Sequence, residues 1–181
     1  MRIEQRKLEG CFEITLDRRS DVRGYFQRTY CRKWFLESGL QVDWVQENQS
    51  HSARENTVRG LHFQIPPHAE TKLVRVVSGA ILDVFVDLRK SSSTFGQWDS
   101  IEISEDNDKM IYIPKGFAHG FRTLTDDVTV QYKVDVEYSP SFEGGVFWND
   151  PMIEVDWGTS AAILSDRDKS LPTWSDFTSP F

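Results

Sequence analysis

Residues 72–88 read KLVRVVSGAILDVFVDL, and this stretch decides the fold class. It holds two apolar or alternating runs, 72–77 and 80–88, separated by the turn dipeptide Ser78-Gly79. Similar runs follow at 98–103, 109–113, 119–124 and 128–138, with a further turn at 114–116. Short runs at this spacing are typical of all-β domains, and the lack of helical stretches between them disfavours a parallel α/β sheet.

The pattern therefore predicts one all-β domain over residues 1–181, closed as a jelly-roll β-sandwich with a few short peripheral helices. The clearest helix is expected near 31–39, where Trp34 and Phe35 lie on one side and Gly39 supplies a stop signal. The segment from 158 to 181 is rich in turn residues, and we expect it to be irregular and to pack on the core.

Alternation in the last run, 128–138, predicts which side chains point inward. Tyr132 shares one face with valines, so it points toward the interior. Its hydroxyl either lines a ligand cavity or belongs to a core tyrosine that is bound to a backbone carbonyl. The inward face comprises Val128, Val130, Tyr132, Val134, Val136 and Tyr138, and the outward face comprises Thr129, Gln131, Lys133, Asp135 and Glu137.

Composition excludes several classes of protein. The net charge is −7 and no Lys/Arg cluster occurs, which argues against binding nucleic acid. No apolar stretch approaches the roughly 20 residues that span a bilayer, and the charged start lacks a signal core, so no membrane association and a cytoplasmic location are expected. Cys11 and Cys31 are too few for a disulfide framework and are expected to be free thiols.

The four histidines do not form a metal motif. They stand at 51, 62, 68 and 119, whereas a metal site needs at least three good ligands brought together. His62 and His119 are expected on separate strands or turns, and His51 and His68 in polar loops without a role. We therefore expect neither a metal nor a cofactor, and a structural role is the alternative for each histidine.

The segment 59–64 (RGLHFQ) and Lys72 group a titratable base with two cations. Histidine titrates near neutral pH and suits general-base work, and a fixed positive charge stabilises the enolate formed when a proton next to a carbonyl is removed. His62 and Lys72 are thus candidates for such chemistry. The alternative is that Arg59 and Lys72 are solvated surface charges.

A series of motifs along residues 1 to about 170 resembles the dTDP-4-dehydrorhamnose 3,5-epimerase family. So many motifs in the same order make the resemblance highly specific. They are 21–26 (DVRGYF), 46–48 (QEN), 59–62 (RGLH), 72–76 (KLVRV), 83–96, 113–121 (IPKGFAHGF), 132–133 (YK), 148–151 (WNDP) and 164–168 (LSDRD).

The resemblance implies a dimeric, cupin-type jelly roll that epimerises C3 and C5 of a nucleotide-linked 4-keto-6-deoxyhexose without a metal. It implies that His62 is the base, held by Asp168. Tyr132 would return a proton on the opposite face, and Lys72 would stabilise the enolate.

The resemblance also implies a set of substrate-binding residues. Arg23 and Arg59 would hold the diphosphate, which suits the forked geometry of arginine. His119 would contact the sugar. The remaining contacts would come from Gln46, Glu47, Asn48, Tyr138, Glu143 and Arg167.

This chain also departs from the family pattern. Arg28 stands where the family usually has an acid, Glu70 replaces the glutamine before the lysine, and 137–138 (EY) replaces a Tyr-Tyr pair; other departures are Phe63 for a tyrosine and Arg167 for a lysine. These departures leave open a single-centre epimerase, acting at C3 or C5 only, on dTDP or another nucleotide sugar. Alternatives of other classes are a non-catalytic carbohydrate-binding cupin and a metal-dependent cupin oxygenase.

Overall fold

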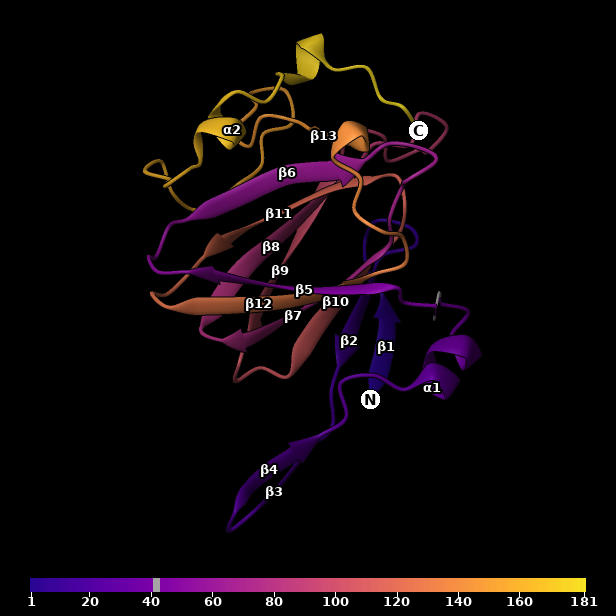
Figure 1. Ribbon diagram of the computed structural model, residues 1–181, viewed down its shortest axis with the longest axis vertical. Helices are drawn as coiled ribbons and strands as arrows, with labels where there is room; N and C mark the ends of the chain where they lie inside the picture. The colour runs from indigo at the N-terminus through magenta and orange to yellow at the C-terminus, as the bar shows by residue number, and fades with distance from the viewer. Residues whose placement is uncertain (41–42) are drawn as a thin grey trace.

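Two antiparallel sheets face each other in the computed structural model, which describes residues 1–40 and 43–181 (Figure 1). The six-stranded sheet has the order β1-β2-β10-β7-β12-β5. Its strands are β1 (Arg2–Gln5), β2 (Phe12–Thr15), β10 (Lys109–Ile113), β7 (Lys72–Ser78), β12 (Val128–Val134) and β5 (Gln46–Ser52). The five-stranded sheet has the order β13-β6-β11-β8-β9. Its strands are β13 (Glu143–Gly145), β6 (Val58–Gln64), β11 (Phe117–Thr123), β8 (Ala80–Asp87) and β9 (Trp98–Ser104).

The space between the sheets is filled by the side chains that alternate inward. Val74 and Val76 of β7 meet Ile81 and Phe85 of β8 in one buried cluster. Tyr132 is half-buried at the margin of this cluster, where the apolar packing ends. Apolar side chains therefore fill the interior near β9 and β10, whereas polar side chains line it near β5 and β6.

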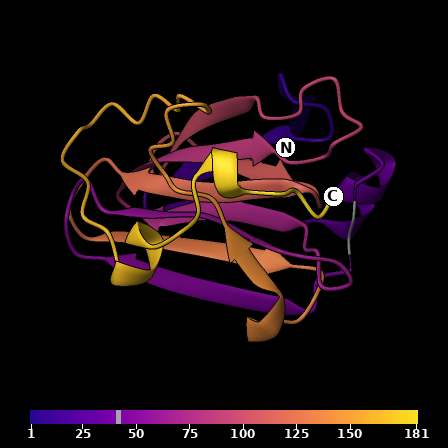
Figure 2. The ribbon, with the colours of Figure 1, turned by 90° about the horizontal axis from the view of Figure 1, so that it is seen from above.

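Two segments outside the sheets pack on the outer faces of the sandwich. The helix α1 (Arg32–Glu37) buries Phe35 against the outer face of the six-stranded sheet. The C-terminal segment, with α2 (Asp166–Lys169) and η2 (Trp174–Asp176), packs Trp174 and Phe177 over the five-stranded sheet. Figure 2 looks down on this second cover. A further 3-10 turn, η1 (Pro140–Phe142), precedes β13.

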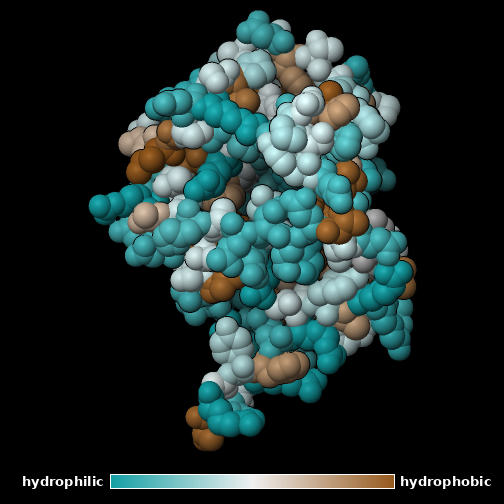
Figure 3. All heavy atoms as spheres, in the orientation of Figure 1, coloured by the Kyte–Doolittle hydropathy of each residue, from teal (hydrophilic) through white to brown (hydrophobic). Residues whose placement is uncertain are grey.

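A hairpin of β3 (Arg18–Asp21) and β4 (Gly24–Gln27) projects away from the sandwich (Figure 1). Val22, Tyr25 and Phe26 are exposed on it. Apolar surface is accordingly visible at the end of the hairpin in Figure 3.

The predicted fold class is confirmed, and the strands expected in residues 72–113 are present within a residue or two of their predicted ends. Helix α1 lies inside the predicted 31–39 segment, and both cysteines are free. Within the described residues no helix is long and apolar enough to cross a membrane.

The strand predicted at 119–124 is also present, as β11 from Phe117 to Thr123. Two other expectations were wrong. The run 128–138 is a strand only to Val134, so the alternation does not extend to Tyr138, which is exposed. His51, expected in a loop, lies in β5, a strand whose alternating positions are all polar and therefore carry no apolar signal.

Candidate active site

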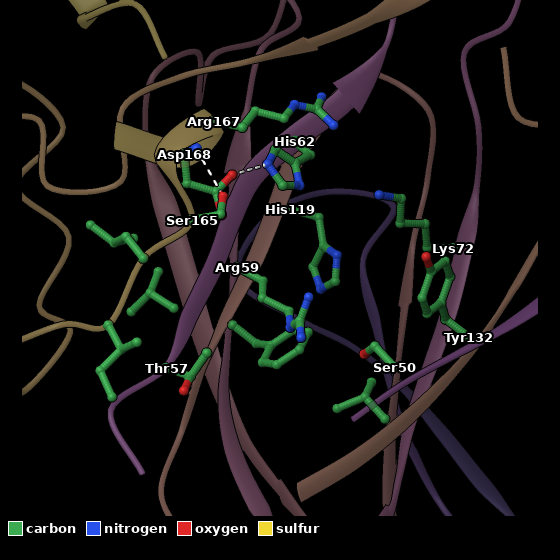
Figure 4. Close-up of a pocket in the computed structure, with 15 residues that line it drawn as sticks. Ser50, Thr57, Arg59, His62, Lys72, His119, Tyr132, Ser165, Arg167 and Asp168 are labelled. Carbon is green, nitrogen blue, oxygen red and sulfur yellow. Dashed lines mark hydrogen bonds and ion pairs between the residues drawn. The ribbon is translucent and has the colours of Figure 1, made fainter. Parts of the chain in front are cut away.

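A cavity of about 440 Å³ opens between the two sheets, where β5, β7 and β12 face β6 and β11. A second hollow of about 330 Å³ adjoins it toward β13. His62, Lys72 and Tyr132 line both hollows and so lie where the two meet. The three candidate residues for proton transfer and charge stabilisation therefore share one site (Figure 4).

An irregularity in β6 turns Arg59 and His62 to the same side. His62 pairs with His119 and Arg59 pairs with Phe121, so two residues of β6 lie opposite Gly120 alone. Such a bulge re-aims the side chains of the longer strand. The backbones approach closely here, because a Cβ on Gly120 would lie 2.7 Å from the Arg59 carbonyl oxygen. Glycine at this position thus allows both side chains to face the cavity.

His62 is held by Asp168, which comes from the other end of the chain. The Nε2 atom of His62 lies 2.5 Å from Oδ1 of Asp168. Ser165 caps α2 and accepts a hydrogen bond from the backbone N–H of Asp168 at 3.1 Å, which fixes the start of the short helix. With Nε2–H donated to the carboxylate, the other ring nitrogen is the proton acceptor and points into the cavity (Figure 4).

The Asp168 carboxyl is ionised in this pair. Burial would raise its pKa, but the hydrogen bond and charge of His62, together with Ser165 and Arg167, hold the pKa of Asp168 below its ordinary value. An ionised Asp168 both orients the imidazole and stabilises the imidazolium that forms when His62 takes up a proton.

Lys72 and Tyr132 occupy the opposite wall, on neighbouring strands of the six-stranded sheet. Lys72 pairs with Val134 across β7 and β12, and Tyr132 lies two residues along on the same inward face. The lysine is shielded, with 13% of its side chain exposed, and its Nζ lies 3.1 Å from Oε1 of Glu70. A base on one wall thus faces a hydroxyl and an ammonium on the other.

A second histidine–carboxylate pair lies beside the first. His119 pairs with His62 across β6 and β11, and its Nε2 is 2.8 Å from Oδ2 of Asp83. Burial raises the pKa of the fully buried Asp83 carboxyl, and the charge and hydrogen bond of His119 oppose the rise. Asp83 therefore holds the ring of His119 in place, and His119 also lines the cavity.

Arg167, Glu143 and Tyr138 form a chain of contacts at the cavity rim. Arg167 lies 2.6 Å from Oε1 of Glu143, and the Tyr138 hydroxyl donates to Oε2 at 2.6 Å. Burial alone would raise the pKa of Glu143, but its two partners lower it, and the hydrogen bond to Glu143 raises the pKa of Tyr138. The rim thus holds an ionised carboxylate between two donors.

Most predicted site residues gather at this cavity. Arg59 lines it and binds Ser52 and the backbone of His51. The predicted residues that line the cavity or the adjoining hollow are Gln46, Asn48, Arg59, His62, Lys72, His119, Tyr132, Tyr138, Glu143, Arg167 and Asp168.

Two predicted residues lie elsewhere. Glu47 is on the outward side of β5, where it pairs with Lys133 at 2.9 Å. Arg23 is on the projecting hairpin, where it binds Asp21 at 2.6 Å and does not line the cavity of its own chain. Successive side chains of a strand point to opposite faces, so Glu47 points outward while Gln46 and Asn48 on either side of it point inward.

Sequence reasoning missed Asp83 and Gln64. Asp83 is a charged residue inside the apolar run 80–88, and a fully buried carboxylate in such a run is a signal for a functional partner. Gln64 is 2% exposed and binds Glu70 and the backbone of Ser139. Nothing in the sequence pattern distinguishes Gln64 from a surface glutamine.

The described residues contain no group of three or more His, Cys, Asp or Glu side chains that could hold a metal ion. His62 and His119, which were expected to stand apart, are cross-strand neighbours, but each is bound to its own carboxylate. Each carboxylate therefore holds one imidazole ring in place.

The comparisons with known proteins agree with this geometry. A model of the dTDP-4-dehydrorhamnose 3,5-epimerase family matches residues 5–176. The chain belongs to this family. It is 46% identical over 154 residues to a dTDP-4-dehydrorhamnose 3,5-epimerase of Sinorhizobium fredii, a match that covers 84% of this chain and 79% of that protein. The resemblance found in the sequence, with its cupin-type fold and its assignment to the sugar-nucleotide epimerases, is confirmed.

Solved structures of relatives superimpose closely on the sandwich. The crystal structure of a Bacillus anthracis dTDP-4-dehydrorhamnose 3,5-epimerase with TDP and PPi bound is 43% identical, with a TM-score of 0.93 over 95% of this chain and 98% of that chain. A 3'-monoepimerase of Streptomyces bikiniensis in complex with dTDP-quinovose is 30% identical, with a TM-score of 0.90 over 96% of this chain and 88% of that chain. One fold thus accommodates both double and single epimerisation.

Proposed function

We propose that this epimerase inverts C3 and C5 of a dTDP-linked 4-keto-6-deoxyhexose through an enolate. The observation that carries the proposal is the opposition of His62 on β6 and Tyr132 on β12, with Lys72 beside the tyrosine in the same cavity. Inverting a carbon centre requires a proton to leave one face of a flat enolate and another to arrive on the opposite face.

In this mechanism His62 removes the proton next to the C4 ketone through its cavity-facing nitrogen. Asp168 fixes the tautomer and stabilises the resulting imidazolium. The Lys72 ammonium stabilises the negative charge that develops on the keto oxygen, and Tyr132 donates a proton to the other face. His119 binds the sugar from the same wall as His62.

The cavity and the adjoining hollow suit the two ends of a nucleotide sugar. Arg59 and Arg167 line the 440 Å³ cavity, and the forked guanidinium group of arginine matches the oxygens of a phosphate. The adjoining hollow offers amides and carboxylates, from Gln46, Asn48 and Glu143, that suit sugar hydroxyls. The TDP bound by the Bacillus anthracis relative supports a thymidine nucleotide as the ligand.

We also propose a homodimer, in which the hairpin of β3 and β4 contacts a second copy. Val22, Tyr25 and Phe26 are exposed on the hairpin, and apolar side chains grouped in this way favour contact with a partner. The hairpin would then carry Arg23 to the diphosphate in the partner's cavity. Free Cys11 and Cys31 support a cytoplasmic location.

The decisive experiment is incubation with dTDP-4-keto-6-deoxyglucose in deuterated water. Deuterium at both C3 and C5, lost in His62→Asn, is the expected result. Deuterium at only one carbon would favour the single-centre alternative. The Streptomyces bikiniensis relative, a 3'-monoepimerase, is an example of that alternative. Equal label in His62→Asn and in the unaltered protein would contradict the role of His62, and no label in either would contradict the proposed substrate.

A further inference from the structure

Glu70 lies at the cavity without a role in the mechanism given above. It lies two residues before the start of β7 and lines the hollow that holds Tyr138 and Glu143. Only 12% of its side chain is exposed. A carboxylate this well shielded needs partners, because burial of an unpaired charge is costly.

Its two oxygen atoms face two different donors. Oε1 lies 3.1 Å from the ammonium of Lys72, and Oε2 accepts a hydrogen bond of 3.0 Å from Nε2 of Gln64. A carboxylate is the side chain that accepts on both oxygens. Glu70 thus connects the proposed enolate-stabilising lysine to a buried amide of β6.

Gln64 is itself fixed from two sides. Its Oε1 accepts from the backbone N–H of Ser139 at 2.7 Å, and its Nε2 also donates to the His68 carbonyl at 3.2 Å. Exchanging the amide oxygen and nitrogen would break both contacts, so the N–H group must point at Glu70. The acceptor for Lys72 is therefore held by backbone groups.

A lysine ammonium is hard to fix in place without a partner. Its four-carbon side chain is flexible, and the ammonium has little directional preference of its own. A charge that must stabilise an oxyanion contributes most when it is fixed before the reaction. The contact with Glu70 restricts the Lys72 ammonium to the point where the two hollows meet.

We propose that Glu70 is the positioning residue for Lys72 in the epimerisation, holding its ammonium ready for the keto oxygen through a network anchored on Gln64. The inference rests on the proposed function, because it assigns Glu70 a role only through Lys72. It also gives a physical role to a position where this chain departs from its family's usual glutamine. A glutamine here would carry an NH2 group in place of one carboxylate oxygen, so a donor would face either the Lys72 ammonium or the Gln64 N–H group.

The test compares Glu70→Ala, Glu70→Gln and the unaltered protein. We expect Glu70→Ala to lower kcat by about tenfold to a hundredfold, the scale expected when a reacting group is displaced, with KM within about twofold. Glu70→Gln should recover part of this loss. Affinity for dTDP alone, measured by calorimetry, should stay unchanged in both variants, because the nucleotide does not need the lysine.

Glu13→Ala is the matched control. Glu13 is equally shielded, at 13%, and its carboxylate lies 2.8 Å from the ammonium of Lys109, on β2 and β10 outside the cavity. It should leave kcat unchanged at a comparable loss of melting temperature. A Glu70→Ala protein with unaltered kcat would overturn the inference, as would a loss of kcat matched by Glu13→Ala. Absence of isotope exchange in the unaltered protein would instead overturn the proposed function.

Discussion

At the scale of single residues, the site depends on a contact between positions far apart in the chain. His62 and Asp168 are 106 residues apart, yet they approach within 2.5 Å. Because the pKa of Asp168 is lowered in the folded protein, the pair stabilises the fold above the carboxyl's unfolded pKa, and that stabilisation is lost as pH falls through the folded value. The same protonation removes the group that orients the base.

Asp168→Asn should therefore keep the fold and lose the reaction. We expect kcat to fall by about a thousandfold or more, because an amide leaves the imidazole in the wrong tautomer. Isotope exchange at C3 and C5 measures the loss. Asp166→Asn is the control, since Asp166 is fully exposed on the same helix and pairs with the exposed Lys169 rather than with a cavity residue. Similar losses in the two variants would contradict the dyad.

Tyr132→Phe separates proton removal from proton return. His62 can still form the enolate and return a deuteron to the same face, so deuterium should enter recovered substrate. Epimerised product should fall by about a hundredfold or more, since the acid on the opposite face is gone. NMR of substrate and product measures both. Product formation at the unaltered rate would show that another group supplies the proton.

At the scale of elements, the bulge between β6 and β11 sets the aim of Arg59 and His62. Gly60 has a φ of +125°, and a Cβ there would lie 2.6 Å from the Gly120 Cα. Both glycines are thus needed for the two strands to approach, and the bulge depends on them. The motif at 59–62 combines a base and a cation with the glycine that orients them.

Gly120→Ala should damage stability and catalysis together. Its new Cβ meets the backbone of Arg59 at 2.7 Å, so the strands must separate, at a cost of about 1–3 kcal/mol. Gly39→Ala is the control, because its new Cβ meets no atom of the described residues within 4 Å and its strain comes from a φ of +72°. Melting temperature should fall in both variants, whereas kcat per folded molecule should fall only in Gly120→Ala. Unaltered kcat in Gly120→Ala would contradict the role of the bulge.

Whether a strand could be predicted from the sequence depends on whether it buries apolar side chains. Strands β7 to β10 bury apolar side chains, and their pattern is visible in the sequence. Strand β5 directs Gln46, Asn48 and Ser50 into a polar cavity, so neither face has an apolar pattern, and the strand was missed. The contact of Asp168 with His62 depends on tertiary structure, and only the family resemblance indicated it.

At the scale of the whole molecule, α1 and the C-terminal segment pack on the outer faces of the sandwich, whereas the hairpin of β3 and β4 extends from it (Figure 1). The hairpin is tied to the body at its base, where Arg18 and Gln27 both bind Asp108. Its exposed apolar side chains and Arg23 lie beyond that anchor. A net charge of −7 also means that an anionic substrate is attracted locally, by residues such as Arg59 and Lys72.

The hairpin proposal predicts a loss of assembly. Tyr25→Ser combined with Phe26→Ser removes apolar contact area without touching the cavity of the same chain, so the dimer should weaken while the fold persists. Sedimentation measures the mass, and circular dichroism serves as the control for folding. A double variant with the mass of the unaltered protein would contradict the proposed interface.

Complementation tests whether Arg23 acts across that interface. Arg23→Ala leaves His62 intact but removes the diphosphate contact, whereas His62→Asn removes the base but keeps Arg23. If Arg23 reaches the partner's cavity, a mixed dimer contains one site with both residues, because each chain supplies what its partner lacks. Co-expressed variants should then show more activity than the mean of the two variants assayed separately. Activity equal to that mean would place Arg23 outside the partner's site and leave Arg59 as the main phosphate contact.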